Sequence, residues 1–227
     1  MDSGITVFEG VEILYEDNHV IVCNKPAGVL SQSDGSDAPD MLTILKRYIK
    51  QKYEKPGEVY LGLVHRLDRP VSGVMVFART SKAASRLSEQ IRAGKTVKCY
   101  RCIVEGNLEG EGELKNYILK DSRTNTVTVT DSPVKDAKFA VLEYNAVRTE
   151  GNMTLVNIKL GTGRSHQIRA QLAHFGHPIA GDRRYGKDGN VSYDIALQSY
   201  RFEFDHPTKK DRMIFEIPVP SCAPWFS

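Results

Sequence analysis

The chain has 227 residues, 41% of them hydrophobic, and a formal net charge of only +3 at pH 7. Such a chain can bury a proper core, either as one large domain or as two small lobes. No window approaches about 18 consecutive apolar residues, and the first residues do not lead from a basic segment into an apolar one. Neither a membrane span nor a secretion signal is therefore expected.

The N-terminal part of the chain predicts two strands, a loop and a helix. Residues 11–15 and 20–24 are apolar, strand-like stretches joined by a polar turn. A Lys-Pro-Ala-Gly run then breaks the chain, and segment 29–39, rich in Ser, Asp and Gly, predicts a mobile loop. A helix is predicted to begin at Asp40, its N-cap, because apolar residues follow at helical spacing, and to end before Pro56.

The most informative feature of the sequence is a single carboxylate among cations. Asp68 lies in the His-Arg-Leu-Asp-Arg-Pro run of residues 65–70, with apolar, strand-like stretches on both sides. It is therefore predicted on a turn at the end of a sheet, where side chains can face a cleft. Pro70 stiffens the turn, and the neighbouring arginines favour the ionised carboxylate. A carboxylate held in this way can serve as a nucleophile or as a base.

This segment alone also allows a purely structural interpretation. An aspartate before a tight turn commonly caps its own backbone, and neighbouring Asp and Arg side chains are common at protein surfaces. Perturbed acids gather at functional sites, but structural ion pairs imitate them. The choice for Asp68 therefore depends on the other segments of the chain.

A second helix is predicted after the Asp68 turn and the strand that follows it. Ser81 can cap this helix and Gly94 can stop it. Its apolar stripe is expected to consist of Ala84, Leu87 and Ile91.

Residues 97–105 predict a strand that carries Tyr100 among basic residues. A tyrosine ring can stack on a nucleic-acid base, although most tyrosines in strands simply pack. Cys99 and Cys102 form a C-x-x-C pattern without a second pair. Positions three apart on a strand point to opposite faces, so neither a redox nor a zinc role is expected. The cysteines instead fit free thiols in a reducing cytoplasm.

The C-terminal half of the chain predicts mainly strands. Segment 108–136 is turn-rich and polar and is expected to be peripheral. A third helix is predicted to start at Ser165 and to close at Gly176. Its inward-facing residues are expected to be Ile168, Leu172 and Phe175. Strands are predicted at 138–147 and 153–160, and two more within 195–218.

Predicted strands outnumber helices, and several follow one another directly. This order indicates an α+β fold with a largely antiparallel sheet, rather than a doubly wound parallel sheet. We expect a single domain over residues 1–227, with residues 1–10 as a short N-terminal extension. The sequence shows no internal repeat and no segment that we expect to form an additional RNA-binding module.

A second informative segment, residues 160–169, runs from a strand through two glycines into a helix. Glycines and a helix N-terminus favour anions, but the run lacks the third glycine of a dinucleotide fingerprint and the ending of a P-loop. The alternative is a capped helix after a glycine turn, and no nucleotide cofactor is predicted. Arg169 follows on the first full turn. A partly buried arginine needs an anionic partner, and Asp68 is the candidate.

Three histidines near this helix, at 166, 174 and 177, invite a zinc interpretation. Their spacing is unusual for a helical zinc pair, which prefers positions four apart, and no cysteine is near. We therefore predict no metal site, and expect packing or RNA contacts from these side chains.

The cations are unevenly distributed along the chain. The segment from Arg79 to Arg101 contains seven Lys and Arg residues and one acidic residue. The segment from Lys159 to Lys187 contains six Lys and Arg residues and one acidic residue. Such segregation indicates two basic segments that meet a polyanion, with nucleic acid the leading candidate. The alternative is that both are solvated helix faces that never meet in space. Replacing Lys95 or Lys98 distinguishes the two cases.

Taken together, these runs resemble the RluA-type family of RNA pseudouridine synthases. The two most specific runs are His65-Arg66-Leu67-Asp68 and the stretch from Gly163 to Arg169. The other matching stretches are Asn24 to Gly28, Ser72-Gly73, Lys98 through Tyr100 to Gly106, and Gly176 to Asp182. They occur in family order from about residue 11 to residue 220 of the printed sequence.

The resemblance implies the pseudouridine synthase fold, a mixed, largely antiparallel sheet flanked by helices with a central catalytic cleft. It also implies an enzyme that converts uridine in RNA to pseudouridine. Asp68 would be the catalytic aspartate, Arg169 its salt-bridge partner, and Tyr100 the aromatic residue beside the target base. Arg66 would help to displace that base from its stack. The side chains expected to contact RNA are His65, Arg66, Lys95, Lys98, Arg164, His166 and Gln167.

This reaction suits residues of these types, because uracil must leave C1′ of the ribose, turn over and rejoin through C5. No cofactor is expected. Asp68 could attack the ribose, attack the base or abstract a ribose proton, and Tyr100 or Asp68 could then take the proton from C5. The sequence does not choose among these routes, and it does not choose between ribosomal and transfer RNA. A monomer is the default expectation.

Some positions depart from the family pattern. Cys102 stands where alanine is frequent and Gln198 where histidine is frequent, and both bear on packing or RNA contact rather than on the core chemistry. The S4-type module of many relatives is also not seen, so the catalytic domain is expected to select the substrate. Two rival functions stay open, a non-catalytic RNA-binding protein on the same fold and a base-releasing hydrolase.

Overall fold

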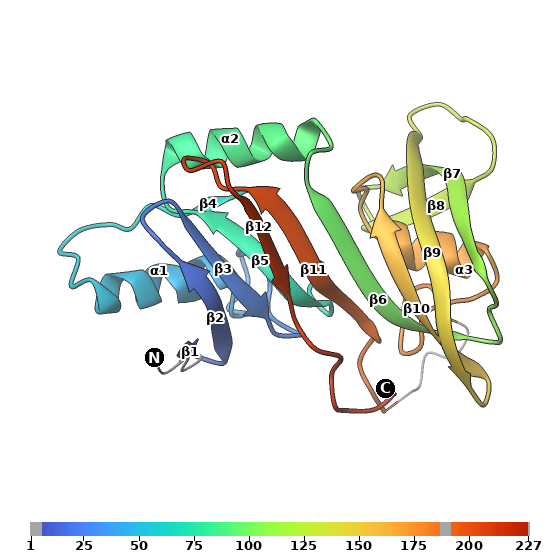
Figure 1. Cartoon of the computed structure of the whole chain (residues 1–227). Coiled ribbons are helices and arrows are strands. Elements are labelled where there is room, and N and C mark those ends of the chain that lie inside the picture. The colour runs from blue at the N-terminus through green and yellow to red at the C-terminus, as the bar shows by residue number, and fades with distance from the viewer. Residues whose placement is uncertain (1–5, 187–191, 227) are drawn as a thin grey trace. The chain divides into compact units, whose positions relative to one another are not determined.

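The computed structural model describes residues 6–186 and 192–226, so Lys187 of the second basic segment lies outside the described residues. The chain forms two compact units (Figure 1). Unit 1 comprises Met1–Val97 and Ser199–Ile217, and unit 2 comprises Lys98–Gln198 and Pro218–Ser227. Every strand pairing with a described register is antiparallel. The predicted α+β class is confirmed.

Unit 1 is built on strands in the order β1-β2-β3-β5-β11, with β4 beside β5 and β12 beside β11. Their bounds are β1 Thr6–Phe8, β2 Val11–Glu16, β3 Val20–Lys25, β4 Gly62–Leu63, β5 Ser72–Ala78, β11 Leu197–Asp205 and β12 Arg212–Glu216. The helices are α1 Met41–Lys52 and α2 Ser81–Arg92. β1 lies inside the segment expected to be only an extension, and it pairs with β2.

Side-chain caps fix where the two helices of unit 1 begin. The Asp40 side chain accepts a hydrogen bond from the N–H of Thr43, as predicted for an N-cap. In α2 the cap is Thr80, whose hydroxyl accepts from the N–H of Ala83, so the prediction of Ser81 was one residue late. Thr80 can cap because its backbone is still extended. Gly94 ends the helix with a positive φ of 67°.

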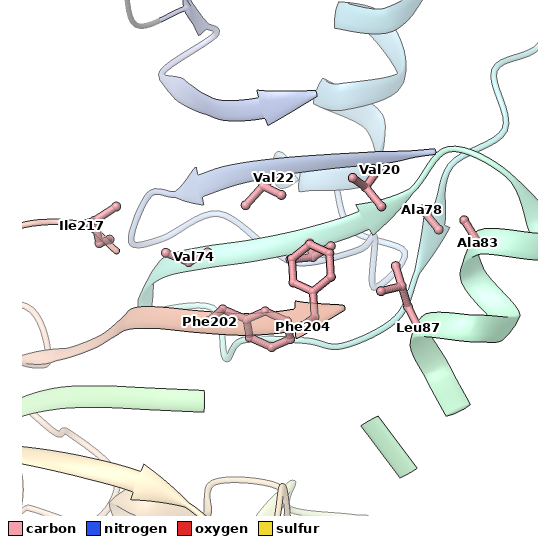
Figure 2. Packing of buried hydrophobic residues seen from close by; sticks show 10 residues of the cluster. Val20, Val22, Val74, Ala78, Ala83, Leu87, Phe202, Phe204 and Ile217 are labelled. Carbon is pink, nitrogen blue, oxygen red and sulfur yellow. The ribbon is translucent and has the colours of Figure 1, made fainter. Parts of the chain in front are cut away.

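The core of unit 1 forms where α2 packs on the sheet. Val22 of β3, Val74 of β5, and Phe202 and Phe204 of β11 gather with Leu87 of α2 (Figure 2). The helix buries Ala83 and Leu87, whereas the predicted stripe residues Ala84 and Ile91 are only half-buried. Because β3 is buried along nearly its whole length, both of its faces must be covered.

Unit 2 is built on strands in the order β6-β10-β9-β7-β8. Their bounds are β6 Val97–Glu105, β7 Glu111–Asp121, β8 Thr126–Thr130, β9 Lys138–Glu150 and β10 Met153–Leu160. The prediction that segment 108–136 is turn-rich was wrong, because this segment supplies β7 and β8. Leu114, Asn116 and Ile118 alternate inward along β7 and are buried, while the residues between them stay polar. A strand with this alternation reads as polar overall.

The helix of unit 2, α3, spans Gln167–His174 and starts later than predicted. The Gln167 side chain explains the delay, because its Oε1 accepts from the N–H of Arg164 and from the hydroxyl of Thr162. These bonds hold residues 162–166 in a turn. Ile168 is buried as predicted, and so is Leu172, whereas Phe175 is 41% exposed, which corrects the predicted inward stripe.

The described part of the chain contains no helix long and apolar enough to cross a membrane. The segment predicted to be a mobile loop, 29–39, contains no helix, and its ends are joined by a bond from the N–H of Leu30 to the carbonyl of Pro39. Its mobility stays a prediction.

Replacing Gly73 tests how tightly the start of β5 is packed. Gly73 has a φ of +131°, and a Cβ there would lie 2.3 Å from the carbonyl oxygen of Ser199. We expect Gly73→Ala to lower the free energy of unfolding by about 3 kcal/mol, because strain and a backbone clash add. Urea unfolding measures the change. The matched control is Gly57→Ala, since a Cβ at Gly57 meets nothing within 4 Å; equal stability of both variants would contradict the packing described.

Candidate active site

Asp68 lies in the turn between β4 and β5, and the main chain of this turn is bonded from the side. The hydroxyl of Ser31 donates to the carbonyl of Leu67 at 2.7 Å and accepts from the N–H of the same residue at 3.1 Å. The carbonyl of Asp68 accepts from the N–H of Val71 at 3.0 Å, which closes the turn. One buried hydroxyl therefore fixes both peptide groups of the residue before the aspartate.

The residue after Asp68 is held by the segment that follows β3. The carbonyl of Arg69 accepts from the N–H of Gly28 at 2.9 Å, and the Nε of Arg69 donates to the carbonyl of Gly28 at 3.0 Å. The predicted stiffness of the turn thus has a second cause besides Pro70, because residues far apart in sequence bond its main chain.

The side chain of Lys25, at the end of β3, bonds main-chain groups of the same region. Its side chain is fully buried, and its Nζ donates to the carbonyls of Pro26, Val29 and Arg69 at 3.0, 2.6 and 3.1 Å. Burial lowers the pKa of Lys25 to about 8, while the negative charge of Asp68 acts in the opposite direction. The sequence analysis did not assign a role to Lys25. The available signal was a lysine at the end of an apolar strand and before a proline.

His65 is tied into the core of unit 1. Its Nε2 accepts from the N–H of Val76 at 3.0 Å, and its ring stacks on Phe202 with centroids 4.7 Å apart and an interplanar angle of 10°. One nitrogen and one ring face are therefore engaged within the protein. Arg66, next along the chain, is exposed, as is Arg69, and Asp68 itself is half-buried. RNA contacts by His65 and Arg66 stay predictions.

In unit 2, Tyr100 lies on β6 opposite Ile158 of β10 and is 8% exposed. Two positions earlier on the same strand, Lys98 is half-buried, and burial lowers the pKa of its ammonium group. Lys95 precedes β6 and is exposed; its N–H donates to the carbonyl of Gln90, and its carbonyl accepts from Arg212.

Arg169 is held by an anionic partner that the sequence analysis did not identify. Its Nε donates to Oδ2 of Asp182 at 2.8 Å, and its Nη2 donates to Oδ1 at 2.7 Å. The guanidinium carbon lies 5.3 Å from the centre of the Tyr185 ring. The need of a buried arginine for a carboxylate was therefore foreseen correctly. Asp68 belongs to the other unit, and its pairing with Arg169 stays a prediction.

The other predicted contact residues of unit 2 have identified partners within the protein. The Nε of Arg164 donates to the carbonyl of Phe139, and the Nδ1 of His166 is bonded to the hydroxyl of Tyr185 at 2.8 Å. Gln167 is 3% exposed, and its Nε2 donates to the carbonyl of Val141. Burial and bonds at both ends of its amide give Gln167 a structural role, and RNA contacts by Arg164, His166 and Gln167 stay predictions.

The histidines named as a zinc possibility lie in separate environments. The Nε2 of His174 is bonded to Asp131 at 2.9 Å, and the Nδ1 of His177 is bonded to the carbonyl of Glu105 at 3.0 Å. Within residues 6–186 and 192–226, no group of three His, Cys, Asp or Glu side chains is arranged to hold a metal ion. The cysteines are free thiols, and burial raises the pKa of Cys23 and Cys102.

Solved structures identify the fold. The chain superposes on human RNA pseudouridylate synthase domain containing 4 with a TM-score of 0.77 and 22% identity, covering 92% of this chain and 88% of that one. Human RNA pseudouridylate synthase domain containing 1 gives a TM-score of 0.75, also with 22% identity, over 96% and 86% of the two chains. The predicted pseudouridine synthase fold is confirmed.

Sequence comparisons identify the family. Residues 19–174 match the family model described as RNA pseudouridylate synthase. An uncharacterized RNA pseudouridine synthase of Aquifex aeolicus is 34% identical over 92% of this chain and 70% of its own length. Ribosomal large subunit pseudouridine synthase D of Pseudomonas aeruginosa is 32% identical over 95% and 70%. The chain therefore belongs to the RNA pseudouridine synthase family, and the predicted enzyme class is confirmed.

Substituting Lys25 tests its buried charge through the pH dependence of stability. The pKa of Lys25 is about 8 in the folded chain, whereas the ordinary pKa of a lysine, expected in the unfolded chain, is 10.5. Between these two pH values the unfolded chain therefore binds more protons than the folded chain. The free energy of unfolding should therefore rise with pH across this window, by up to about 3 kcal/mol. In Lys25→Met this contribution is lost. Denaturant unfolding from pH 7 to 10.5 measures it.

The control is Lys50→Met, which removes an exposed lysine from the same unit and should keep the rise. A rise of equal size in Lys25→Met and in the unmodified chain would show that Lys25 is not charged and buried as described.

Proposed function

We propose that the chain isomerises specific uridines of ribosomal RNA to pseudouridine, with Asp68 as the catalytic carboxylate. The observation that carries this proposal is the main-chain bonding around Asp68, in which Ser31 and Lys25 hold the residues on either side of it. A carboxylate fixed before substrate arrives is what positional catalysis requires. Ribosomal RNA is favoured over transfer RNA because several relatives are named for the large ribosomal subunit.

The reaction breaks the bond between C1′ and N1, turns the base, and joins C1′ to C5. A proton leaves C5 and N1 gains one, so the product has the composition of the substrate and no redox step is needed. Asp68 serves as the nucleophile or the base that opens this sequence. Either Tyr100 or Asp68 takes the proton from C5.

Arg169 and Tyr100 complete the proposed site. The guanidinium of Arg169 favours the ionised form of Asp68 and orients it, and the ring of Tyr100 lies beside the target base. The exposed Arg66 helps to displace that base from its stack, which costs about a few kcal/mol and less in a loop. The chain is proposed to act as a monomer in the cytoplasm, without a metal or another cofactor, and its free cysteines agree with that compartment.

Some cations of the first basic segment are bonded to other parts of the protein or buried in it. Arg79 donates to the carbonyl of Asp17 and Arg86 to that of Pro207, and Arg101 is 8% exposed. These cations are engaged or buried within the protein. Besides Arg86, the exposed members of the segment are Lys82, Arg92 and Lys95, and these three are the proposed contacts to the RNA backbone.

The variant Asp68→Asn tests the proposed chemistry. We expect kcat to fall by roughly a thousandfold or more, because the amide can act neither as nucleophile nor as base, while the affinity for RNA stays measurable. Pseudouridine formation in ribosomal RNA and filter binding measure the two effects. Asp37→Asn, at an exposed position of the same unit, is the control and should keep full activity. Retained turnover in Asp68→Asn excludes the role, and release of free uracil by the unmodified chain indicates a hydrolase instead.

The variant Lys95→Ala tests the basic segment. An exposed cation that contacts a phosphate releases one counterion, so its loss should weaken RNA binding and lower the slope of log K against log salt by about 1. Binding titrations at several salt concentrations give the slope. The control is Lys120→Ala, an exposed lysine of β7 outside both basic segments. If Lys95→Ala and Lys120→Ala leave the same slope, the segment is only a solvated face.

A further inference from the structure

Asp182 is a buried carboxylate of unit 2 that accepts four hydrogen bonds. Its side chain has no exposed surface, and that of Arg169 is 8% exposed. Besides the two bonds from Arg169, its Oδ1 accepts from the N–H of Arg184 at 2.9 Å and from the N–H of Tyr185 at 3.2 Å. These bonds lower the pKa of Asp182 although burial acts to raise it.

The bonds from Arg169 define the plane of its guanidinium. Nε and Nη2 are adjacent donors on one edge of the group, and each meets a different oxygen of Asp182. A two-point contact of this kind fixes both the direction and the rotation of an arginine side chain, which a single bond does not. The long, flexible arm of Arg169 is therefore set in one orientation by Asp182.

The main chain beside Asp182 is anchored to β6, the strand that carries Tyr100. The N–H of Ala180 donates to the carbonyl of Ile103 at 2.9 Å. Gly181 has a φ of +78°, and a Cβ there would lie 2.6 Å from the carbonyl oxygen of Asp194. The main chain next to the Asp182 carboxylate is thus bonded to the strand that carries Tyr100, the proposed aromatic residue.

The ring of Tyr185 lies near the guanidinium of Arg169. Because Asp182 caps the turn at Tyr185, the ring lies 5.3 Å from the guanidinium carbon. The Tyr185 hydroxyl accepts from the N–H of Val127 at 3.0 Å and is bonded to the Nδ1 of His166 at 2.8 Å. His166 precedes α3 with a φ of 50°, an uncommon conformation for a residue other than glycine. The start of the helix that carries Arg169 is thereby fixed as well.

We infer that Asp182 is a positioning residue for the isomerisation, and that it sets the orientation in which Arg169 meets the catalytic carboxylate. This inference rests on the proposed roles of Asp68 and Arg169. Asp182 itself is not proposed to touch the substrate. Its contribution is to hold the guanidinium in the orientation used in the transition state, so its loss should affect the chemical step more than RNA binding.

The variant Asp182→Asn tests the inference with little change in shape. The amide oxygen can still accept from the N–H groups of Arg184 and Tyr185, but its NH₂ group now faces the Nε–H of Arg169, and two donors cannot bond. We expect kcat to fall by about a hundredfold, with KM for RNA changed by less than about threefold.

The matched control is Asp131→Asn. Asp131 is also bonded to a side chain of unit 2, His174, but the Asp131 side chain is 75% exposed. This control should leave kcat and KM unchanged. A wild-type kcat in a folded Asp182→Asn variant would overturn the inference.

A double variant separates positioning from general support of the fold. If Asp182 acts through Arg169, adding Asp182→Asn to Arg169→Lys should lower kcat by less than about threefold beyond Arg169→Lys alone. A full further hundredfold loss would overturn the inference. Should Asp182→Asn not fold, Asp182→Glu keeps the buried charge and displaces the carboxylate by one methylene. It should give an intermediate kcat with KM for RNA nearly unchanged, and a wild-type kcat there would again overturn the inference. If the unmodified chain forms no pseudouridine, the proposed function itself fails.

Discussion

The structure of unit 1 depends on how the main chain around one aspartate is held. A turn that carries a charged side chain would be mobile if its peptide groups were left to water. Here the groups beside Asp68 are bonded to Ser31, Gly28 and the buried ammonium of Lys25, which come from another part of the chain. The conformational entropy of this turn is therefore lost when the chain folds, and RNA binding does not have to order the turn again.

In unit 2, hydrogen bonds restrict a positively charged side chain, that of Arg169. Arg169 has a long side chain with considerable rotamer freedom, and Asp182 removes that freedom through two bonds to a fully buried carboxylate. Unit 1 thus holds the main chain beside Asp68, and unit 2 holds the guanidinium of Arg169, each through contacts of its own. In an isomerisation that needs no cofactor, such orientation and the electrostatics that accompany it are the means of lowering the barrier.

The sequence predicted those features that arise from local patterns. The Asp40 cap, the strand at 97–105 and the turn at Asp68 all follow from neighbouring residues, and the structure contains each of them. The roles of Lys25 and Asp182 were missed because their partners are set by the fold: Lys25 bonds a residue 44 positions away, and Asp182 one 13 positions away. Segment 108–136 was misjudged because its buried residues alternate with polar ones.

Hydrogen exchange at the amide of Leu67 tests the central claim most directly. That N–H donates to the buried hydroxyl of Ser31, immediately before the aspartate. If the turn is ordered before substrate arrives, this amide should exchange slowly in the free protein, and an RNA substrate should change its rate little. Fast exchange in the free protein that becomes slow only when RNA is added would contradict the account, because the turn would then be ordered by the substrate and not by the fold.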